Sequence, residues 1–299
     1  MSAHHPRVRS PSPLLVLTLA LLGISMAAPL IKLSDAHPIA IAAWRLAFSL
    51  VPIVLLGWRH DSFRAYRTLD RSLVIASVGA GVLLALHFWS WNASLRYTSV
   101  AASVTLVNLQ PVIIAVVSAR FLGERPSRRQ WVGILIAMVG AIALAWVDAP
   151  AGAAAGSNAL LGDALAVVGA ITAAGYYLLG RTVRKVLDTW AYVLLAYGAA
   201  LVTLLILAVP AGASLWPQPP QEMAIFLGLA LGPMLLGHTG MNWALGRLPA
   251  YIVNLTVLGE PIGATLLAAA LPFIGEVPSV GTLLCGVVVL AGVVIAAKR

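Results

Sequence analysis

Charged residues are scarce in this chain. They account for 10% of its 299 residues, whereas hydrophobic residues account for 61%. Soluble globular domains carry roughly 25% charged residues, and a soluble chain this apolar could not cover its surface with polar groups. The composition therefore excludes an ordinary soluble protein and predicts an integral membrane protein.

Cysteine is almost absent too. The single cysteine, Cys285, excludes an internal disulfide framework and a metal site built from cysteines. It lies in an apolar stretch with a helical pattern, and we expect it to pack as a small core residue.

The sequence also lacks the common motifs of enzymes. It contains no H-E-x-x-H, G-x-S-x-G or G-x-x-x-x-G-K-[ST] element, which are motifs of zinc peptidases, serine hydrolases and P-loop proteins. No segment is long enough for an ATP-binding domain, so the chain cannot be a primary pump by itself. We expect no enzyme activity, no cofactor and no metal. A membrane enzyme, a non-transporting receptor or scaffold, and a channel stay as alternatives, although no soluble effector domain and no filter-like polar loop supports them.

Long apolar runs dominate what is present. A bilayer is crossed by about 20 residues of helix, and ten runs have about this length. The runs are too long for strands and do not alternate between apolar and polar residues. The sequence therefore predicts an all-α integral membrane protein with ten transmembrane helices. The predicted helices span residues 13–32, 38–57, 72–94, 98–120, 129–147, 160–180, 190–209, 222–244, 250–271 and 277–297.

The basic residues indicate on which side of the membrane each loop lies. The net charge is +9. If the N-terminus is cytoplasmic and the loops alternate, sixteen of the 19 lysines and arginines lie on the inner side, Lys32 and Arg96 lie on the outer side, and Arg45 lies within the bilayer. This distribution follows the positive-inside rule. It predicts that both termini are cytoplasmic, and it explains the basic composition without a nucleic-acid partner.

A segment of the first half recurs in the second half. Residues 92–127, NASLRYTSVAASVTLVNLQPVIIAVVSARFLGERPS, match residues 242–279. The repeating unit is five predicted helices, so residues 1–150 form a first repeat and residues 151–299 a second. Because five is odd, the second repeat enters the membrane inverted, which is typical of secondary transporters with a binding site near the bilayer midplane. The matched pairs are Asn92 with Asn242, Leu95 with Leu245, Gln110 with Glu260, and Pro111 with Pro261.

Each repeat also contains the element G-E-x-P-S, at residues 123–127 and 275–279. Glycine favours the end of one helix, and Pro-Ser favours the start of the next. The acidic residue then lies near a helix N-terminus, where the helix dipole stabilises it. We therefore interpret Glu124 and Glu276 as structural residues.

These features resemble the drug/metabolite transporter superfamily, and most closely its EamA-type exporters. The resemblance rests on the ten-helix pattern, the duplication, L-Q-P (109–111) answered by G-E-P (259–261), and the paired G-E-x-P-S elements. The segments WRLAF (44–48) and GDALAVVGAITAAGYYLLGR (162–181) also fit that family. The resemblance implies a carrier of the bacterial inner membrane that exports amino acids, other metabolites or toxic compounds, with coupling to protons.

Glu260 is the first candidate site residue. It lies about 13 residues after Arg247, which is about 19 Å along a helix and near the midplane. A buried carboxyl can hold a proton in one state and release it in another, as a proton-coupling residue must. The alternative is a neutral structural acid that is hydrogen-bonded to a neighbouring helix beside a kink at Pro261. The matching residue of the first repeat, Gln110, cannot titrate.

The other polar candidates are one cation and two histidines. Arg45 can bind a substrate carboxylate with two hydrogen bonds, pair with an acid, or extend toward the interface. His87 and His238 can titrate near neutral pH, or they can be hydrogen-bonded packing residues. Their spacing does not predict a metal site.

Aromatic and amide residues complete the candidate list. Trp44, Tyr176 and Tyr177 are expected to line a cavity, whereas Trp89 and Trp91 are expected in the interfacial belt. The remaining candidates are Asn108 and Asn254, which either orient a substrate or bond neighbouring helices, and the helix hinges Pro111 and Pro261.

Together these residues favour a substrate that carries both charges and an apolar part. The sequence predicts a secondary transporter that exports an amino acid or a similar small amphipathic metabolite by alternating access, with protons as coupling ions. Export of drugs or toxic compounds, and import, are the alternatives. The expected partners are the small-molecule substrate, protons and the lipid bilayer, and the sequence does not distinguish a monomer from a homodimer.

Overall fold

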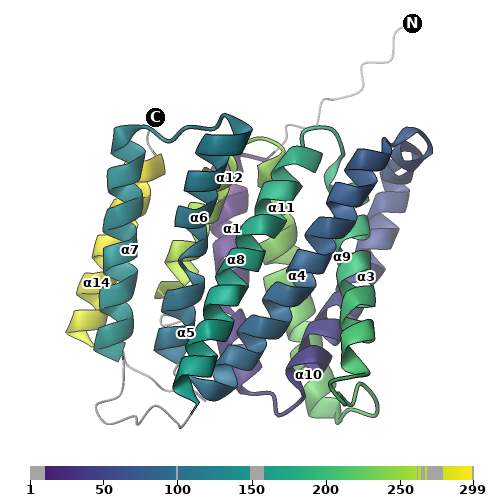
Figure 1. Cartoon of the computed structure of the whole chain (residues 1–299), viewed down its shortest axis with the longest axis horizontal. Coiled ribbons are helices and arrows are strands. Elements are labelled where there is room, and N and C mark those ends of the chain that lie inside the picture. The colour runs from purple at the N-terminus through teal and green to yellow at the C-terminus, as the bar shows by residue number, and fades with distance from the viewer. Residues whose placement is uncertain are drawn as a thin grey trace, which may run out of the picture.

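The computed structural model describes residues 11–98, 100–148, 158–260, 262–263, 267 and 279–297. Helices run side by side between two opposite faces, and α1 begins and α14 ends at the same face (Figure 1). The described part contains no strand, which confirms the all-α prediction. Its elements are α1 Pro13–Ser25, α2 Ala27–Lys32, α3 Pro38–Arg59, η1 Ser62–Thr68, α4 Arg71–Tyr97, α5 Val100–Val107, α6 Gln110–Val117, η2 Ser118–Leu122, α7 Arg128–Asp148, α8 Ala159–Val183, α9 Thr189–Ala208, α10 Pro220–Leu229, η3 Ala230–Thr239, α11 Gly240–Leu245, α12 Ala250–Asn254, η4 Leu255–Gly259 and α14 Val280–Ala297.

Helical residues occur in all ten predicted ranges. Six helices of the described part are long and apolar enough to cross a membrane, and three shorter apolar helices accompany them. Ten membrane crossings therefore stay a prediction. The six spans are Pro13–Lys32, Pro38–Arg59, Arg71–Tyr97, Ala159–Val183, Thr189–Ala208 and Pro220–Leu245.

Several predicted helices are interrupted rather than continuous. The range 98–120 is divided at Asn108 and Leu109, and α6 begins at Gln110. Pro111 lies in the first turn of α6, where its missing N–H leaves no bond unmade. The range 222–244 contains the π-helix η3, with Pro233 inside it, and the range 250–271 contains the 3₁₀ helix η4. The break at Asn108 and Leu109 lies beside the predicted hinge Pro111. The changes of helix type in η3 and η4 were not predicted, because a uniformly apolar run carries no signal for them.

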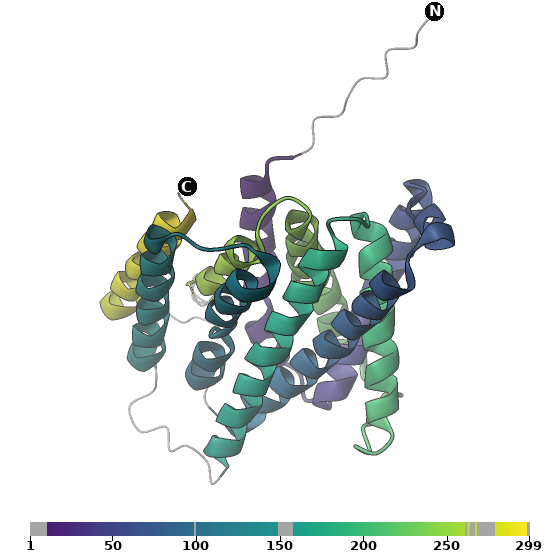
Figure 2. The ribbon, with the colours of Figure 1, turned by 45° about the horizontal axis from the view of Figure 1, so that its top comes forward.

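The helix contacts have the pattern expected of two related halves. The third predicted helix packs on the sixth as α4 on α8, and the first packs on the eighth as α1 on η3. These two contacts are equivalent, because exchanging the two halves of the chain converts the first contact into the second. The second and seventh helices (α3, α9), the fourth and ninth (α6, α12) and the fifth and tenth (α7, α14) pack on each other. The pair α7–α14 forms one edge of the bundle in both views (Figures 1 and 2).

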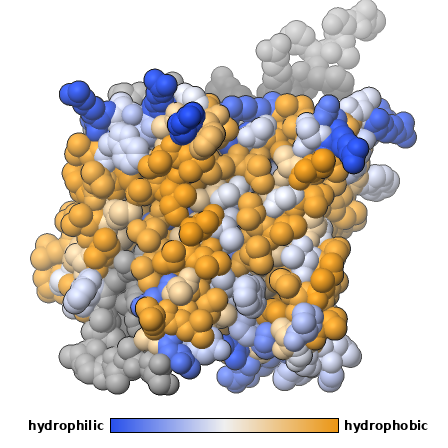
Figure 3. Space-filling view, in the orientation of Figure 1, coloured by the Kyte–Doolittle hydropathy of each residue, from blue (hydrophilic) through white to orange (hydrophobic). Residues whose placement is uncertain are grey.

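The outer surface is predominantly apolar at mid-height, and hydrophilic residues gather toward the two faces (Figure 3). This distribution suits a lipid environment around the bundle. Exposed large apolar side chains come from many elements: Leu14, Val51, Ile75, Val139, Leu160, Ile206 and Val287.

The first G-E-x-P-S element ends one helix and starts the next, as its sequence predicts. Gly123 has a positive φ of 67° and follows η2, as a helix-terminating glycine does. Ser127 and Gln130 form reciprocal hydrogen bonds at the start of α7: Ser127 N to Gln130 Oε1 is 2.8 Å, and Gln130 N to Ser127 Oγ is 3.3 Å. Glu124 does not cap α7 and instead contacts other helices, as described below. Glu276 lies outside the described residues.

Glycine at position 23 permits the close approach of α1 and η3. A Cβ atom on Gly23 would lie 2.7 Å from the Gly232 carbonyl oxygen and 2.8 Å from the Gly237 nitrogen. Gly23→Ala is therefore expected to lower the free energy of unfolding by ~1–3 kcal/mol. Gly198→Ala is the matched control, because nothing lies within 4 Å of its added Cβ. Thermal unfolding in detergent should show a lower midpoint for the first variant and an equal or higher one for the second; equal losses would contradict this packing.

Candidate functional site

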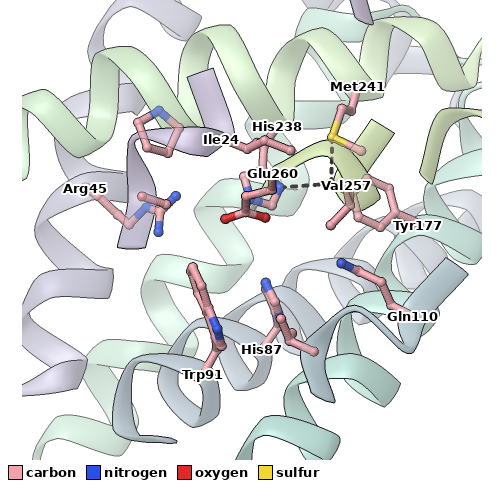
Figure 4. Close-up of a pocket in the computed structure, with 13 residues that line it drawn as sticks. Ile24, Arg45, His87, Trp91, Gln110, Tyr177, His238, Met241, Val257 and Glu260 are labelled. Atoms are coloured by element: carbon pink, nitrogen blue, oxygen red, sulfur yellow. Dashed lines mark hydrogen bonds between the residues drawn. The ribbon is translucent and has the colours of Figure 1, made fainter. Parts of the chain in front are cut away.

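A small cavity lies between the two halves. Its volume is about 30 Å³, and its lining residues come from both (Figure 4). The elements involved are α1, α2, α3, α4, α5 and α6 of the first half, and α8, η3, α11 and η4 of the second. Six residues predicted from the sequence line it: Arg45, His87, Gln110, Tyr177, His238 and Glu260.

Arg45 brings a buried cation to the cavity from α3. The residue is 1% exposed, so it does not extend toward an interface. Its guanidinium carbon lies 4.1 Å from the centre of the Phe88 ring, which provides a cation–π contact. Nε and Nη1 have no hydrogen-bond partner within the described part of the chain. A buried charge with unpaired donors is costly, and Glu260 is the acidic side chain that lines the same cavity.

Glu260 directly follows η4 and reaches the same cavity. It is 7% exposed. Figure 4 shows Glu260 and Arg45 turned toward a common space. Among the described residues Glu260 makes neither an ion pair nor a hydrogen bond. The interpretation of this acid as a structural residue stays a prediction, as does its role in coupling. Pro261 lies outside the described residues.

The two histidines meet in the cavity. His87 Nδ1 lies 3.0 Å from the Gly169 carbonyl oxygen, and since a carbonyl only accepts, Nδ1 donates. His238 Nδ1 lies 3.3 Å from the Tyr177 hydroxyl, which also lies 3.3 Å from Met241 Sδ. The imidazole centres are 6.4 Å apart. These contacts join α4, α8, η3 and α11 around the cavity.

The matched positions Gln110 and Glu260 both line the cavity. Gln110 is 4% exposed, and its Oε1 has no partner among the described residues. The repeat thus places an amide and a carboxyl group at equivalent positions of one site. This asymmetry gives the cavity a single titratable acid among its lining residues.

Four predicted residues do not line the cavity. Trp44 Nε1 donates to the Leu215 carbonyl oxygen at 2.8 Å. The Tyr176 hydroxyl accepts from Asn242 Nδ2 at 2.5 Å. Asn108 and Asn254 are 2% and 0% exposed, and their side-chain amides are unpaired within the described part. They lie near the breaks in the fourth and ninth predicted helices.

Trp91 was missed as a site residue. It was expected in the interfacial belt, but it is 5% exposed and lines the cavity. Its ring is stacked on His87, with centres 6.1 Å apart and planes 3° apart. Its Nε1 has no hydrogen-bond partner in the described chain. The signal was available, because residues four apart on a helix share one face, and His87 was already a candidate.

No group of three or more His, Cys, Asp or Glu residues that could hold a metal ion occurs in the part of the chain described here. The chemistry of the cavity is therefore that of one guanidinium, one carboxyl, two imidazoles, an amide and aromatic side chains.

Apolar helices in two matched halves, with interrupted segments beside a central charged cavity, define a membrane-spanning protein of the transporter type. The chain belongs to the EamA-like transporter family, whose model matches residues 11–146 and 160–297, once in each half. This finding confirms the predicted family.

Two similar proteins extend the comparison. An uncharacterized transporter from Archaeoglobus fulgidus is 28% identical over 171 residues. The match spans 56% of this chain and 56% of that relative. A solved protein crystal structure superposes with a TM-score of 0.74 at 18% identity and covers 95% of this chain and 96% of that chain, which shows a shared fold.

Proposed function

We propose that the protein is a secondary active transporter that exports a small zwitterionic metabolite, such as an amino acid, across the bacterial inner membrane. The observation that carries this proposal is Arg45, which is 1% exposed, has two unpaired donors and faces the same cavity as Glu260. A substrate carboxylate would pair with Arg45, and a substrate amine with Glu260. Trp91 and Tyr177 would flank the apolar part of the substrate.

Transport would proceed by alternating access. A volume of about 30 Å³ is far below the roughly 300–1,000 Å³ of pockets for drug-sized ligands. A metabolite therefore requires the halves to separate at one face. The breaks at Asn108–Leu109 and in η4 lie next to the cavity residues Gln110 and Glu260. Such interrupted helices are places where a transporter can bend.

The proposed orientation places both termini in the cytoplasm. The uneven distribution of lysine and arginine supports it. Inward proton flow would then drive export if a proton and the substrate amine compete for Glu260. The amine would bind the ionised carboxylate, and protonation from outside would release it.

The test compares metabolites in the medium of bacterial cells that express the chain with those of cells that carry an empty vector. Enrichment of a zwitterionic metabolite outside, reproduced as saturable flux in proteoliposomes, would support the proposal. Depletion from the medium would favour import, and protection against an added toxic compound would favour drug export. If none of the compounds enriched in the medium or depleted from it shows saturable flux in proteoliposomes, an enzyme or a scaffold is favoured. Flux that does not saturate would indicate a channel.

The placement of Trp91 predicts a specific effect on substrate affinity. Trp91→Phe removes an unpaired donor that lines the cavity, so we expect KM to rise about 3- to 10-fold. Trp44→Phe removes a donor bonded to Leu215 outside the cavity. We expect this control to keep KM and to lose about 1 kcal/mol of stability. Both are measured as saturable flux in proteoliposomes, and a raised KM for Trp44→Phe alone would contradict the assignment.

A further inference from the structure

We propose that Lys32 and Arg181 are two matched gate residues, one at each end of the cavity, whose bonds must break alternately during transport. The proposal rests on alternating access as proposed above and adds the side chains that control it. Lys32 Nζ donates to the Leu95 carbonyl oxygen at 3.0 Å. Arg181 Nη1 donates to the Leu245 carbonyl oxygen at 2.5 Å. Leu95 and Leu245 are equivalent positions of the two repeats.

The two cations occupy corresponding places. Lys32 is the last residue of α2, at the end of the first predicted helix of the first repeat. Arg181 lies in the last turn of α8, the first predicted helix of the second repeat. Each cation therefore binds the end of the third predicted helix of its own repeat. The same bond made twice at matched positions indicates a property of the duplicated unit rather than an isolated surface contact.

The two bonds lie at opposite ends of the bundle. Thr98 Oγ1 donates to Asp163 Oδ1 at 2.7 Å, so α8 begins beside the end of α4 that carries Leu95. Arg181 follows 18 residues further along α8, about 27 Å away at 1.5 Å per residue. The cavity lies between these ends, since His87 on α4 and Tyr177 on α8 both line it.

Each bond joins two groups of helices. One group is α4 with α8, and the other is α1 with η3, α11 and the adjoining α2; the two groups also touch where α8 meets α11. Lys32 reaches from the second group to the first, whereas Arg181 reaches from the first to the second. Separation of these groups at one face therefore requires that the bond at that face breaks, while the other bond can remain as the pivot.

Carboxylates strengthen the closure at both ends. Arg181 Nε donates to Glu124 Oε1 at 2.6 Å, and Glu124 Oε2 accepts from Ala250 N at 3.0 Å. These contacts cross from the first repeat to the second. At the other end, Glu222 accepts from Ser34 Oγ at 2.5 Å and from Asp35 N at 2.8 Å. Both ends are closed in this conformation, which agrees with the small cavity.

Loss of one bond should favour opening at its own end, because the other end keeps its closing contacts. Charge-assisted hydrogen bonds are stronger than neutral ones. We expect removal of either cation to shift the ratio of the two open forms by about 10-fold. Lys32→Met and Arg181→Met keep an unbranched side chain and remove the donors, and Lys32→Arg and Arg181→Lys restore a cation.

The experiment measures access to the cavity from each side. Val257 lines the cavity, so Val257→Cys in a Cys285→Ser background provides a single reporter thiol. A membrane-impermeant maleimide is applied to intact cells and to inverted vesicles. Lys32→Met should increase labelling from the Lys32 side about 10-fold and reduce labelling from the other side, and Arg181→Met should do the reverse. The cation-restoring variants should return both rates toward those of the parent.

Arg64→Met is the matched control, because Arg64 pairs with Asp61 on the exposed surface at 2.7 Å. It should leave both rates unchanged. Labelling shifts of the same sign in Lys32→Met and Arg181→Met, or no shift in monodisperse protein, would overturn the gate proposal. Opposite shifts without transport of any compound would keep the gates and reject the proposed function. Saturable transport without the shifts would keep the function and reject the gates.

Discussion

Arg45→Met is expected to reduce transport at least about 100-fold while the thermal midpoint stays equal or rises. The guanidinium is buried, and its Nε and Nη1 donate to no described group. Methionine keeps an unbranched chain over Phe88, and it leaves no acceptor among the described residues without a partner that Arg45 had supplied. Substitution of a buried charge by an apolar residue of similar volume is often neutral or stabilising. A substrate carboxylate, however, would lose its charged partner, which costs ~2–5 kcal/mol in comparable sites.

Arg184 supplies the control, because it is also buried but its guanidinium donates hydrogen bonds to acceptors of the described chain. It is 7% exposed, and it donates to Asn242 O at 2.9 Å, to Thr189 Oγ1 at 2.7 Å and to Leu187 O. Burial lowers the pKa of Arg184 to about 10, so the residue remains a cation at neutral pH. Arg184→Met would leave these acceptors unpaired and should cost roughly 2–5 kcal/mol of stability.

The two variants are compared by initial flux in proteoliposomes at matched protein density and by thermal unfolding in detergent. We expect Arg45→Met to be stable and inactive and Arg184→Met to be destabilised. Arg45→Lys should retain part of the flux, about 10-fold reduced, because an ammonium does not reproduce two parallel hydrogen bonds. If Arg45→Met loses stability as Arg184→Met does, or if its flux stays within about twofold of wild type, Arg45 is a structural residue.

The main features of the fold could be predicted, because a lipid environment and a duplicated segment both leave clear patterns in the sequence. Apolar run length predicts helices, and the match of Gln110 with Glu260 predicts that equivalent positions meet at one site. The structure places both in one cavity. The family match then covers both halves of the chain.

Other features depend on contacts between distant segments and could not be predicted locally. Glu124 was interpreted from its position near a helix start, but its partners are Arg181 and Ala250 in the other half. Trp44 and Trp91 both lie near predicted helix ends. Only Trp91 turns toward the cavity, because it shares a helix face with His87, whereas Trp44 bonds to a loop carbonyl. Side-chain direction, rather than proximity to a helix end, decides between the cavity and the interface.

Glu260→Gln is expected to abolish proton-driven export, with a loss of at least about 100-fold, and to leave a small downhill flux that does not depend on pH. Glutamine keeps the shape of the side chain but cannot ionise, so it neither binds an amine as a carboxylate does nor carries a proton across the membrane. It also makes position 260 identical to its repeat partner Gln110. If the coupling proton binds at Glu260, the variant cavity has no lining carboxyl to replace it.

Glu222→Gln is the matched control, because Glu222 and Glu260 are each 7% exposed. The carboxylate of Glu222 is held by Ser34 and Asp35, and none of these three residues lines the cavity. Flux is measured in proteoliposomes with and without an imposed pH gradient. Glu222→Gln should keep the response to the gradient even if its maximal rate falls, whereas Glu260→Gln should lose the response. An unchanged response in Glu260→Gln would show that the coupling proton binds elsewhere, and His87 and His238, which also line the cavity, would be the next positions to replace.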